Sequence, residues 1–98
     1  MTAKEKKVLE ALSQGEFENI KATDDLIEHL MDTSRETIEK NQAAIKDETA
    51  KGEKKRQAFI DKLEAQNEIL QKVIENGETY LENCEKVEVL FSLYEEEE

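Results

Sequence analysis

The sequence predicts an all-α fold, in which a short N-terminal helix is followed by a long helical hairpin of the coiled-coil type. The 98 residues include no proline and only three glycines, so the chain has few means of making the tight turns that sheets require. Charged residues make up 40% of the chain, which is typical of long solvated helices. Apolar residues also recur at alternating steps of four and three, a period that keeps one helix face turned toward a partner helix.

The first helix is expected over residues 2–14. Thr2 and Glu5 have the spacing of a capping box, in which each residue satisfies a free backbone N–H at the start of a helix. A short apolar face follows, made of Val8, Leu9, Ala11 and Leu12. Gly15 suits a helix terminator, so the break before the next helix should fall between residues 13 and 17.

A second helix is expected over residues 17–50, with an apolar stripe that is weaker than the one that follows it. The stripe consists of Ile20, Ile27, Met31, Ile38 and Ile45. Polar residues also occupy seam positions, namely Asp24, Ser34, Asn41 and Glu48. Polar seam residues lower stability but penalise slipped pairings, so this helix should be better at choosing a register than at binding tightly.

The seam is interrupted between residues 46 and 57, where Ala50 is the only apolar residue and Gly52 lies among charged side chains. The phase of the apolar repeat also shifts across this segment. Two explanations compete, a continuous helix with a stutter and a helical hairpin. We favour the hairpin, because a glycine, a missing seam and a register change coincide. The basic cluster at residues 51–56 would then lie at the hairpin tip, where a solvated junction is the simplest interpretation.

The third helix is expected over residues 53–94 and carries the longest apolar stripe. Its members are Phe59, Leu63, Gln66, Leu70, Val73, Gly77, Tyr80, Cys84, Val87, Phe91 and Tyr94. The helix could break near residue 77, but the period passes through Gly77 without losing phase, so we interpret this glycine as a weak point in a continuous helix. Further apolar flanks widen the face beyond what two helices need, which predicts self-association into a homodimer or higher oligomer. The expected oligomer seam comprises Phe59, Leu63, Leu70, Val73, Tyr80 and Cys84, and residues 95–98 are expected to form a disordered acidic tail.

Charge and cysteine content exclude several classes of partner. The net charge of −11 argues against binding to nucleic acid or to an anionic membrane, and favours basic partners. Cys84 is the only cysteine, so it cannot form an internal disulfide. The sequence has neither a signal-peptide pattern nor a run of the ~20 apolar residues that cross a bilayer. We therefore expect a cytoplasmic protein of a bacterial or other host cell.

No arrangement of residues predicts an enzyme. His29 is the only histidine, and Asp25 and Asp32 on the same helical side complete no catalytic or metal unit with it. Cys84 lies on the apolar stripe without an activating base, which favours a core role. We predict no catalytic residues, no metal, no cofactor and no small-molecule substrate.

The function predicted is that of a helical protein–protein interaction module, a small adaptor, chaperone or inhibitor of a larger protein. The densest apolar run supplies the expected partner-binding residues, Val87, Leu90, Phe91, Leu93 and Tyr94. If the facing helix is shorter, this end of the third helix would be left exposed as a docking site. Two alternatives stay open: a structural or scaffolding coiled coil of viral or filament assembly, and an acidic nucleic-acid mimic of the phage anti-defence type.

Overall fold

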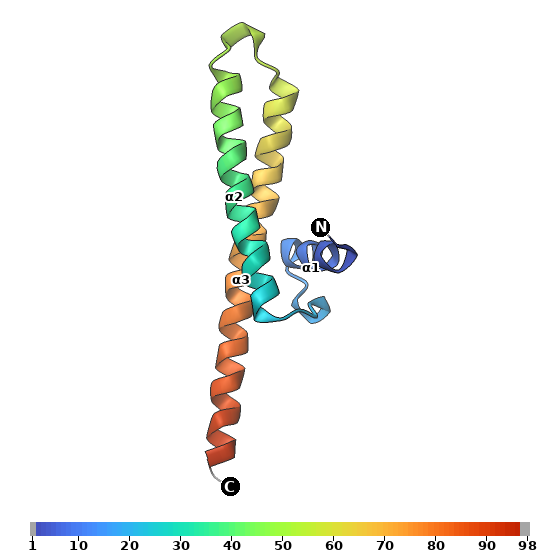
Figure 1. Cartoon of the computed structure of the whole chain (residues 1–98), viewed down its shortest axis with the longest axis vertical. Coiled ribbons are helices and arrows are strands. Elements are labelled where there is room, and N and C mark those ends of the chain that lie inside the picture. The colour runs from blue at the N-terminus through green and yellow to red at the C-terminus, as the bar shows by residue number, and fades with distance from the viewer. Residues whose placement is uncertain (1, 97–98) are drawn as a thin grey trace.

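The chain folds as a helical hairpin with a short N-terminal helix packed against its side (Figure 1). The structure, a computed structural model, describes the backbone of residues 2–96 and the side chains of residues 2–87 and 89. Helix α2 (Asp24–Thr49) and helix α3 (Gln57–Glu96) run antiparallel, and α1 (Ala3–Gln14) lies across them. The molecule measures 70 × 23 × 17 Å, and the described part of the chain contains no strand. The predicted all-α class and the helical hairpin are confirmed.

Local signals define both ends of α1. The Thr2 side chain accepts a hydrogen bond from the Glu5 N–H, and the Glu5 carboxylate accepts one from the Thr2 N–H, so the predicted capping box is present. Gly15 ends the helix in the left-handed region, at φ 70°. The N–H groups of Gly15 and Glu16 bond the carbonyls of Leu12 and Ala11, the paired closure of a Schellman motif.

The second helix begins at Asp24, so its predicted start at residue 17 is wrong. The intervening chain forms a short 3-10 helix, η1 (Phe17–Asn19), and then an extended segment. Thr23 accounts for the later start, because its hydroxyl accepts the Leu26 N–H and two aspartates follow it in the first turn. That N-cap signal is visible in the sequence and outweighs the apolar pattern that begins at Phe17.

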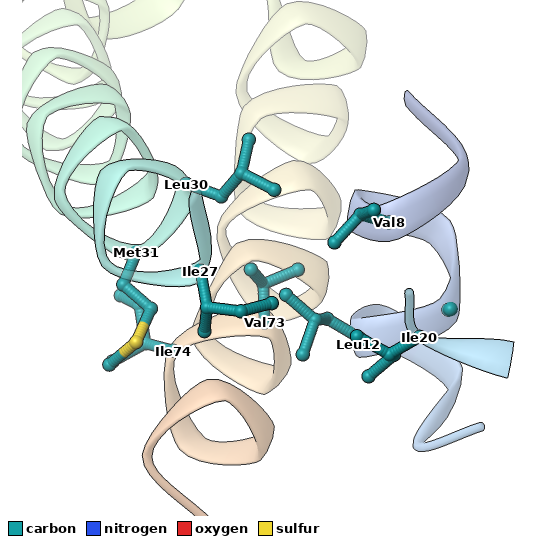
Figure 2. Packing of buried hydrophobic residues seen from close by; sticks show 9 residues of the cluster. Val8, Leu12, Ile20, Ile27, Leu30, Met31, Val73 and Ile74 are labelled. Carbon is teal, nitrogen blue, oxygen red and sulfur yellow. The ribbon is translucent and has the colours of Figure 1, made fainter. Parts of the chain in front are cut away.

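The hydrophobic core lies where α1 meets the hairpin (Figure 2). Leu12, Ile27 and Val73 are fully buried there, one from each helix. The rest of the buried cluster consists of Val8, Ala11, Ile20, Leu30, Met31 and Ile74. Because α1 covers one side of the wide apolar face of α3, this burial is completed within one chain, and the breadth of the face does not by itself require a second copy.

Away from α1, the seam between α2 and α3 is polar. Asn41 is buried and donates through Nδ2 to the side-chain oxygens of Gln66 and Asn67, both at 2.8 Å. Ser34, also buried, donates to the Leu30 carbonyl within its own helix at 2.7 Å. Both residues occupy the seam positions expected from the sequence. The hydrogen bonds of Asn41 fix the pairing of the two helices, because a shifted register would leave its buried amide without these partners.

A second 3-10 helix, η2 (Gly52–Lys54), turns the chain at the hairpin tip. Gly52 adopts φ 62°, a left-handed conformation that favours glycine. The Glu48 side chain, only 4% exposed, lies within 2.9 Å of Lys51 Nζ and 3.1 Å of Arg56 Nε, and its carboxylate also accepts the Arg56 backbone N–H at 2.8 Å. These hydrogen bonds, from the Arg56 guanidinium above all, lower the pKa of Glu48 to about 2. Arg56 therefore helps to close the hairpin and does not belong to a freely solvated basic tip.

Helix α3 is continuous from Gln57 to Glu96, with no break at Gly77. Its start at Gln57 and its extension to Glu96 differ from the predicted span of residues 53–94, because η2 occupies the first part of that span. Residues 95 and 96 continue the helix, and residues 97–98 of the predicted tail lie outside the described part. Gly77 is buried beside Met31, where a Cβ atom would lie 2.7 Å from Met31 Cγ and Sδ, so the close approach of α2 explains the glycine.

At two positions near the hairpin tip, the more buried residue of α3 is the one that follows the expected seam residue. Phe59 is only half-buried, whereas its neighbour Ile60 is buried. Gln66 is exposed, whereas Asn67 is half-buried and bonded to Asn41. Of the expected oligomer seam, Val73 is fully buried within the chain itself, and five residues are half-buried: Phe59, Leu63, Leu70, Tyr80 and Cys84.

Candidate interaction surfaces

The principal candidate surface is the part of α3 that extends beyond the start of α2, residues 82–96, here called the α3 overhang (Figure 1). The last residues of α3 that join the core are Tyr80, whose ring stacks on Phe17 with centroids 6.4 Å apart, and Leu81. At the rise of an α-helix, the overhang is about 22 Å long. It runs straight out from the body of the molecule, without a neighbouring helix of the same chain.

Two valines give the overhang exposed apolar surface. Val87 is 48% exposed and Val89 is 59% exposed. They lie about 200° apart around the helix axis, and so on opposite sides of it. Val87 continues the stripe of half-buried Tyr80 and Cys84, whereas Val89 shares a face with Glu82, Glu85 and Lys86. The overhang therefore has one apolar face that continues the stripe and one acidic face.

The expected partner-binding residues all belong to this overhang. Val87 is exposed, as the prediction required of a docking residue. The side chains of Leu90, Phe91, Leu93 and Tyr94 lie outside the described residues, although the backbone of all four is helical. The structure therefore places one of the five predicted side chains and leaves their binding role as a prediction.

The overhang is also acidic. Residues 82–96 contain five glutamates and one lysine, a net charge of −4. Lys86 lies 3.2 Å from Glu82, an exposed ion pair one helical turn apart. Such a pair contributes little binding or stability, so the field around this segment is set by its glutamates.

A second candidate surface is a basic groove between α1 and the chain that precedes α2. It has a volume of about 340 Å³ and is lined by Ala3, Lys4, Lys7, Val8, Asn19 and Lys21. Its three lysines come from two separate segments, α1 and the stretch after η1. This cluster is not visible in the sequence, because Lys21 joins the other two only when the chain folds back after Gly15.

A third candidate is an apolar groove of about 260 Å³ between α1 and α3. Leu9, Ile69, Leu70 and Val73 form its apolar lining. Ile69 is 54% exposed at its edge, while Val73 forms part of the core. Nothing in its charge or shape distinguishes one kind of occupant from another.

Asp25, His29 and Asp32 lie within two turns of α2. His29 and Asp25 are exposed, and Asp32 is paired with Arg35 at 2.9 Å. Burial, with Cys84 as a secondary cause, raises the pKa of Tyr80. Within the part of the chain that the structure describes, no three His, Cys, Asp or Glu side chains gather in a way that could hold a metal ion. None of the helices in that part combines the length and the apolar content needed to cross a bilayer.

In comparisons with family models, with curated proteins and with solved structures, no match to this chain was found. A proposal for its function therefore depends on the surfaces described above.

Proposed function

We propose that the chain is a non-enzymatic helical interaction module, a small adaptor, chaperone or inhibitor, whose α3 overhang docks a basic amphipathic helix of a larger protein. One observation carries the proposal. Helix α3 continues for about 22 Å past its partner helix α2 and keeps an exposed apolar residue, Val87, in line with the stripe of the hairpin.

An unaccompanied helix of this length is marginal in water, since most helical stability in proteins comes from packing an apolar face. A partner helix laid along the stripe would take the place that α2 occupies nearer the tip. Burial of Val87 by the partner would remove apolar surface from water, and the hydrophobic effect favours that transfer. The residues that follow Val87 on the same period, Phe91 and Tyr94, are of the types that dominate binding energies at interfaces.

The charge of the overhang selects the chemistry of the partner. Two overhangs laid side by side would bring a net charge of −4 against another −4, which disfavours a symmetric coiled coil through this segment. A partner helix with lysines or arginines flanking an apolar stripe would instead find complementary charges along both edges. A cytoplasmic site of action fits the single cysteine of the chain.

A designed peptide tests this proposal. A labelled peptide three heptads long, with leucines on the stripe and lysines beside it, is titrated with the full chain by fluorescence anisotropy, against a twin with glutamates beside the stripe. We expect the basic peptide to bind and the acidic twin to fail. Val87→Asp should weaken binding at least about tenfold, because it places a carboxylate against an apolar stripe. Lys54→Asp, a larger charge change at the hairpin tip, should leave binding unchanged. Equal binding of both peptides, or no effect of Val87→Asp, would exclude the overhang as the docking arm.

A further inference from the structure

The basic groove has the composition of a docking site for an acidic helix. Lys4 and Lys7 lie three residues apart on α1, about 4.5 Å along the helix axis, and Lys21 faces the same groove from the segment after η1. The lining also includes two apolar residues, Ala3 and Val8. Within the part of the chain whose side chains are described, no ion pair involves these three lysines.

The acidic face of the α3 overhang has the matching arrangement. Glu82 and Glu85 also lie three residues apart on one side of a helix, with the same axial spacing as the two lysines. Val89 lies one turn further along that side and is 59% exposed. The face thus presents two carboxylates and then an apolar side chain, against a groove that presents three ammonium groups and two apolar residues. Lys86, which pairs with Glu82, also lies on this face and leaves its net charge negative.

We propose that the basic groove binds the acidic face of the α3 overhang of a second copy of this chain. The contact is intermolecular, because α3 is continuous and carries its overhang away from α1 of the same chain (Figure 1). Charge complementarity favours this occupant over a symmetric pairing of the two overhangs, where glutamates would meet glutamates. The contact joins two different surfaces, so each chain has one free groove and one free overhang, and association continues into a ring or an open chain of subunits.

The docked overhang keeps its Val87 side available, because Val87 and Val89 lie on opposite sides of the helix. The inference rests on the same overhang as the proposed function but uses its other face. Self-association and partner binding can therefore be tested by separate substitutions.

Charge reversal at both surfaces provides the experiment. The first variant carries Lys4→Glu with Lys7→Glu, and the second carries Glu82→Lys with Glu85→Lys; all four side chains are exposed, so both variants should fold. Sedimentation velocity on the full chain should reveal concentration-dependent association of the wild type. Raising the ionic strength from about 0.1 M to about 1 M, where the Debye length falls from about 10 Å to about 3 Å, should weaken it.

Each reversal variant alone should associate at least about tenfold more weakly, because like charges then meet in the contact. An equimolar mixture of the two variants should associate again, since the acidic groove of the first accepts the basic overhang of the second. Two matched controls should associate as the wild type does: Lys54→Glu with Lys55→Glu at the tip, and Glu64→Lys with Glu68→Lys on the exposed side of α3.

Three results would overturn the inference: a wild type that stays monomeric at all concentrations, reversal variants that associate like the controls, or a mixture that stays dissociated. Binding of the basic peptide separates the two proposals. If Lys4→Glu with Lys7→Glu retains peptide binding while the wild type never self-associates, the second-copy contact is wrong and the docking arm stands. If association follows the charge-reversal pattern while the peptide fails to bind, the docking arm is wrong and the second-copy contact stands.

Discussion

Replacement of Gly77 by alanine should destabilise the protein, although alanine is the better helix former. At an unconstrained interior position of a helix, this substitution raises the free energy of unfolding by about 1 kcal/mol. Gly77 is not unconstrained, because a Cβ atom there would lie 2.7 Å from both Cγ and Sδ of Met31. Carbon atoms pack at about 3.5–4.0 Å, so the Met31 side chain would have to move by about 1 Å.

Met31 has little room for that movement, since it is only 4% exposed and belongs to the core cluster. Overpacking of this kind costs about 1–3 kcal/mol, which after the gain in helix propensity leaves a net loss of about 1 kcal/mol. The sign should reverse when Met31 is shortened first. In a Met31→Ala background the clash is absent, and Gly77→Ala should then stabilise the protein by about 1 kcal/mol.

Urea denaturation followed by the helical circular dichroism signal measures all four proteins of this cycle. The two positions should show a coupling free energy of about 2 kcal/mol, a value within the range for residues in direct contact. If Gly77→Ala stabilises the wild type as much as it stabilises Met31→Ala, the close approach of α2 and α3 at this point is wrong.

Three further predictions concern the hairpin tip, the attachment of α1 and the buried face. Glu48→Gln should lower the melting temperature at pH 7. Because the pKa of Glu48 is depressed to about 2, the contribution of its carboxylate to stability is complete above the usual carboxyl pKa and is lost as pH falls toward 2. The melting temperatures of wild type and variant should therefore converge in acid, and they would not do so if Glu48 were solvated. Asn76→Asp should loosen α1 and lower the free energy of unfolding in urea by about 1–3 kcal/mol. Asn76 Nδ2 donates to the Leu12 carbonyl, whereas a carboxylate cannot donate and would face the negative end of α1. Asn83→Asp on the exposed side of α3 is the control, and equal stabilities of the two variants would contradict the contact. Leu70→Asp should lower the free energy of unfolding by several kcal/mol, because Leu70 is half-buried between α1 and α3. Lys55→Glu should leave the melting temperature unchanged, because Lys55 is hydrated at the tip. Equal effects of the two substitutions would mean that the buried face is misassigned.

The sequence predicted the helices and the hairpin well, because those depend on local signals. The Thr2 capping box, the termination at Gly15 and the reversal around Gly52 each follow from residues close together in the chain. The polar seam positions Ser34 and Asn41 were also predicted, since a strict repeat places them on the apolar side of α2.

The burial of two adjacent residues of α3 in the core could not be predicted from a repeat for two helices, because it depends on α1. Val73 and Ile74 are both buried, Val73 fully, in the core that α1 and α2 form with α3. An apolar repeat for two packed helices assigns only one of these neighbours to the seam, whereas three packed helices bury both. The same packing completes the wide apolar face within one chain, which the sequence alone attributed to an oligomer.

The candidate site depended on the relative lengths of α2 and α3. The late start of α2 at Asp24 leaves the C-terminal part of α3 uncovered, whereas the apolar pattern predicts a helix that begins at residue 17. The basic groove was missed for a different reason. Lys21 lies far along the chain from Lys4 and Lys7, and only the turn after Gly15 brings them together.

Hydrogen exchange of the backbone amides tests the docking arm most directly. Because residues 82–96 form a helix without a neighbour, their amides should exchange faster than those of the core part of α3 in dilute protein. Addition of the basic three-heptad peptide should slow exchange in residues 82–96 and leave the hairpin tip unchanged. Protection confined to the tip, or an overhang whose exchange is unaffected by bound peptide, would contradict the account.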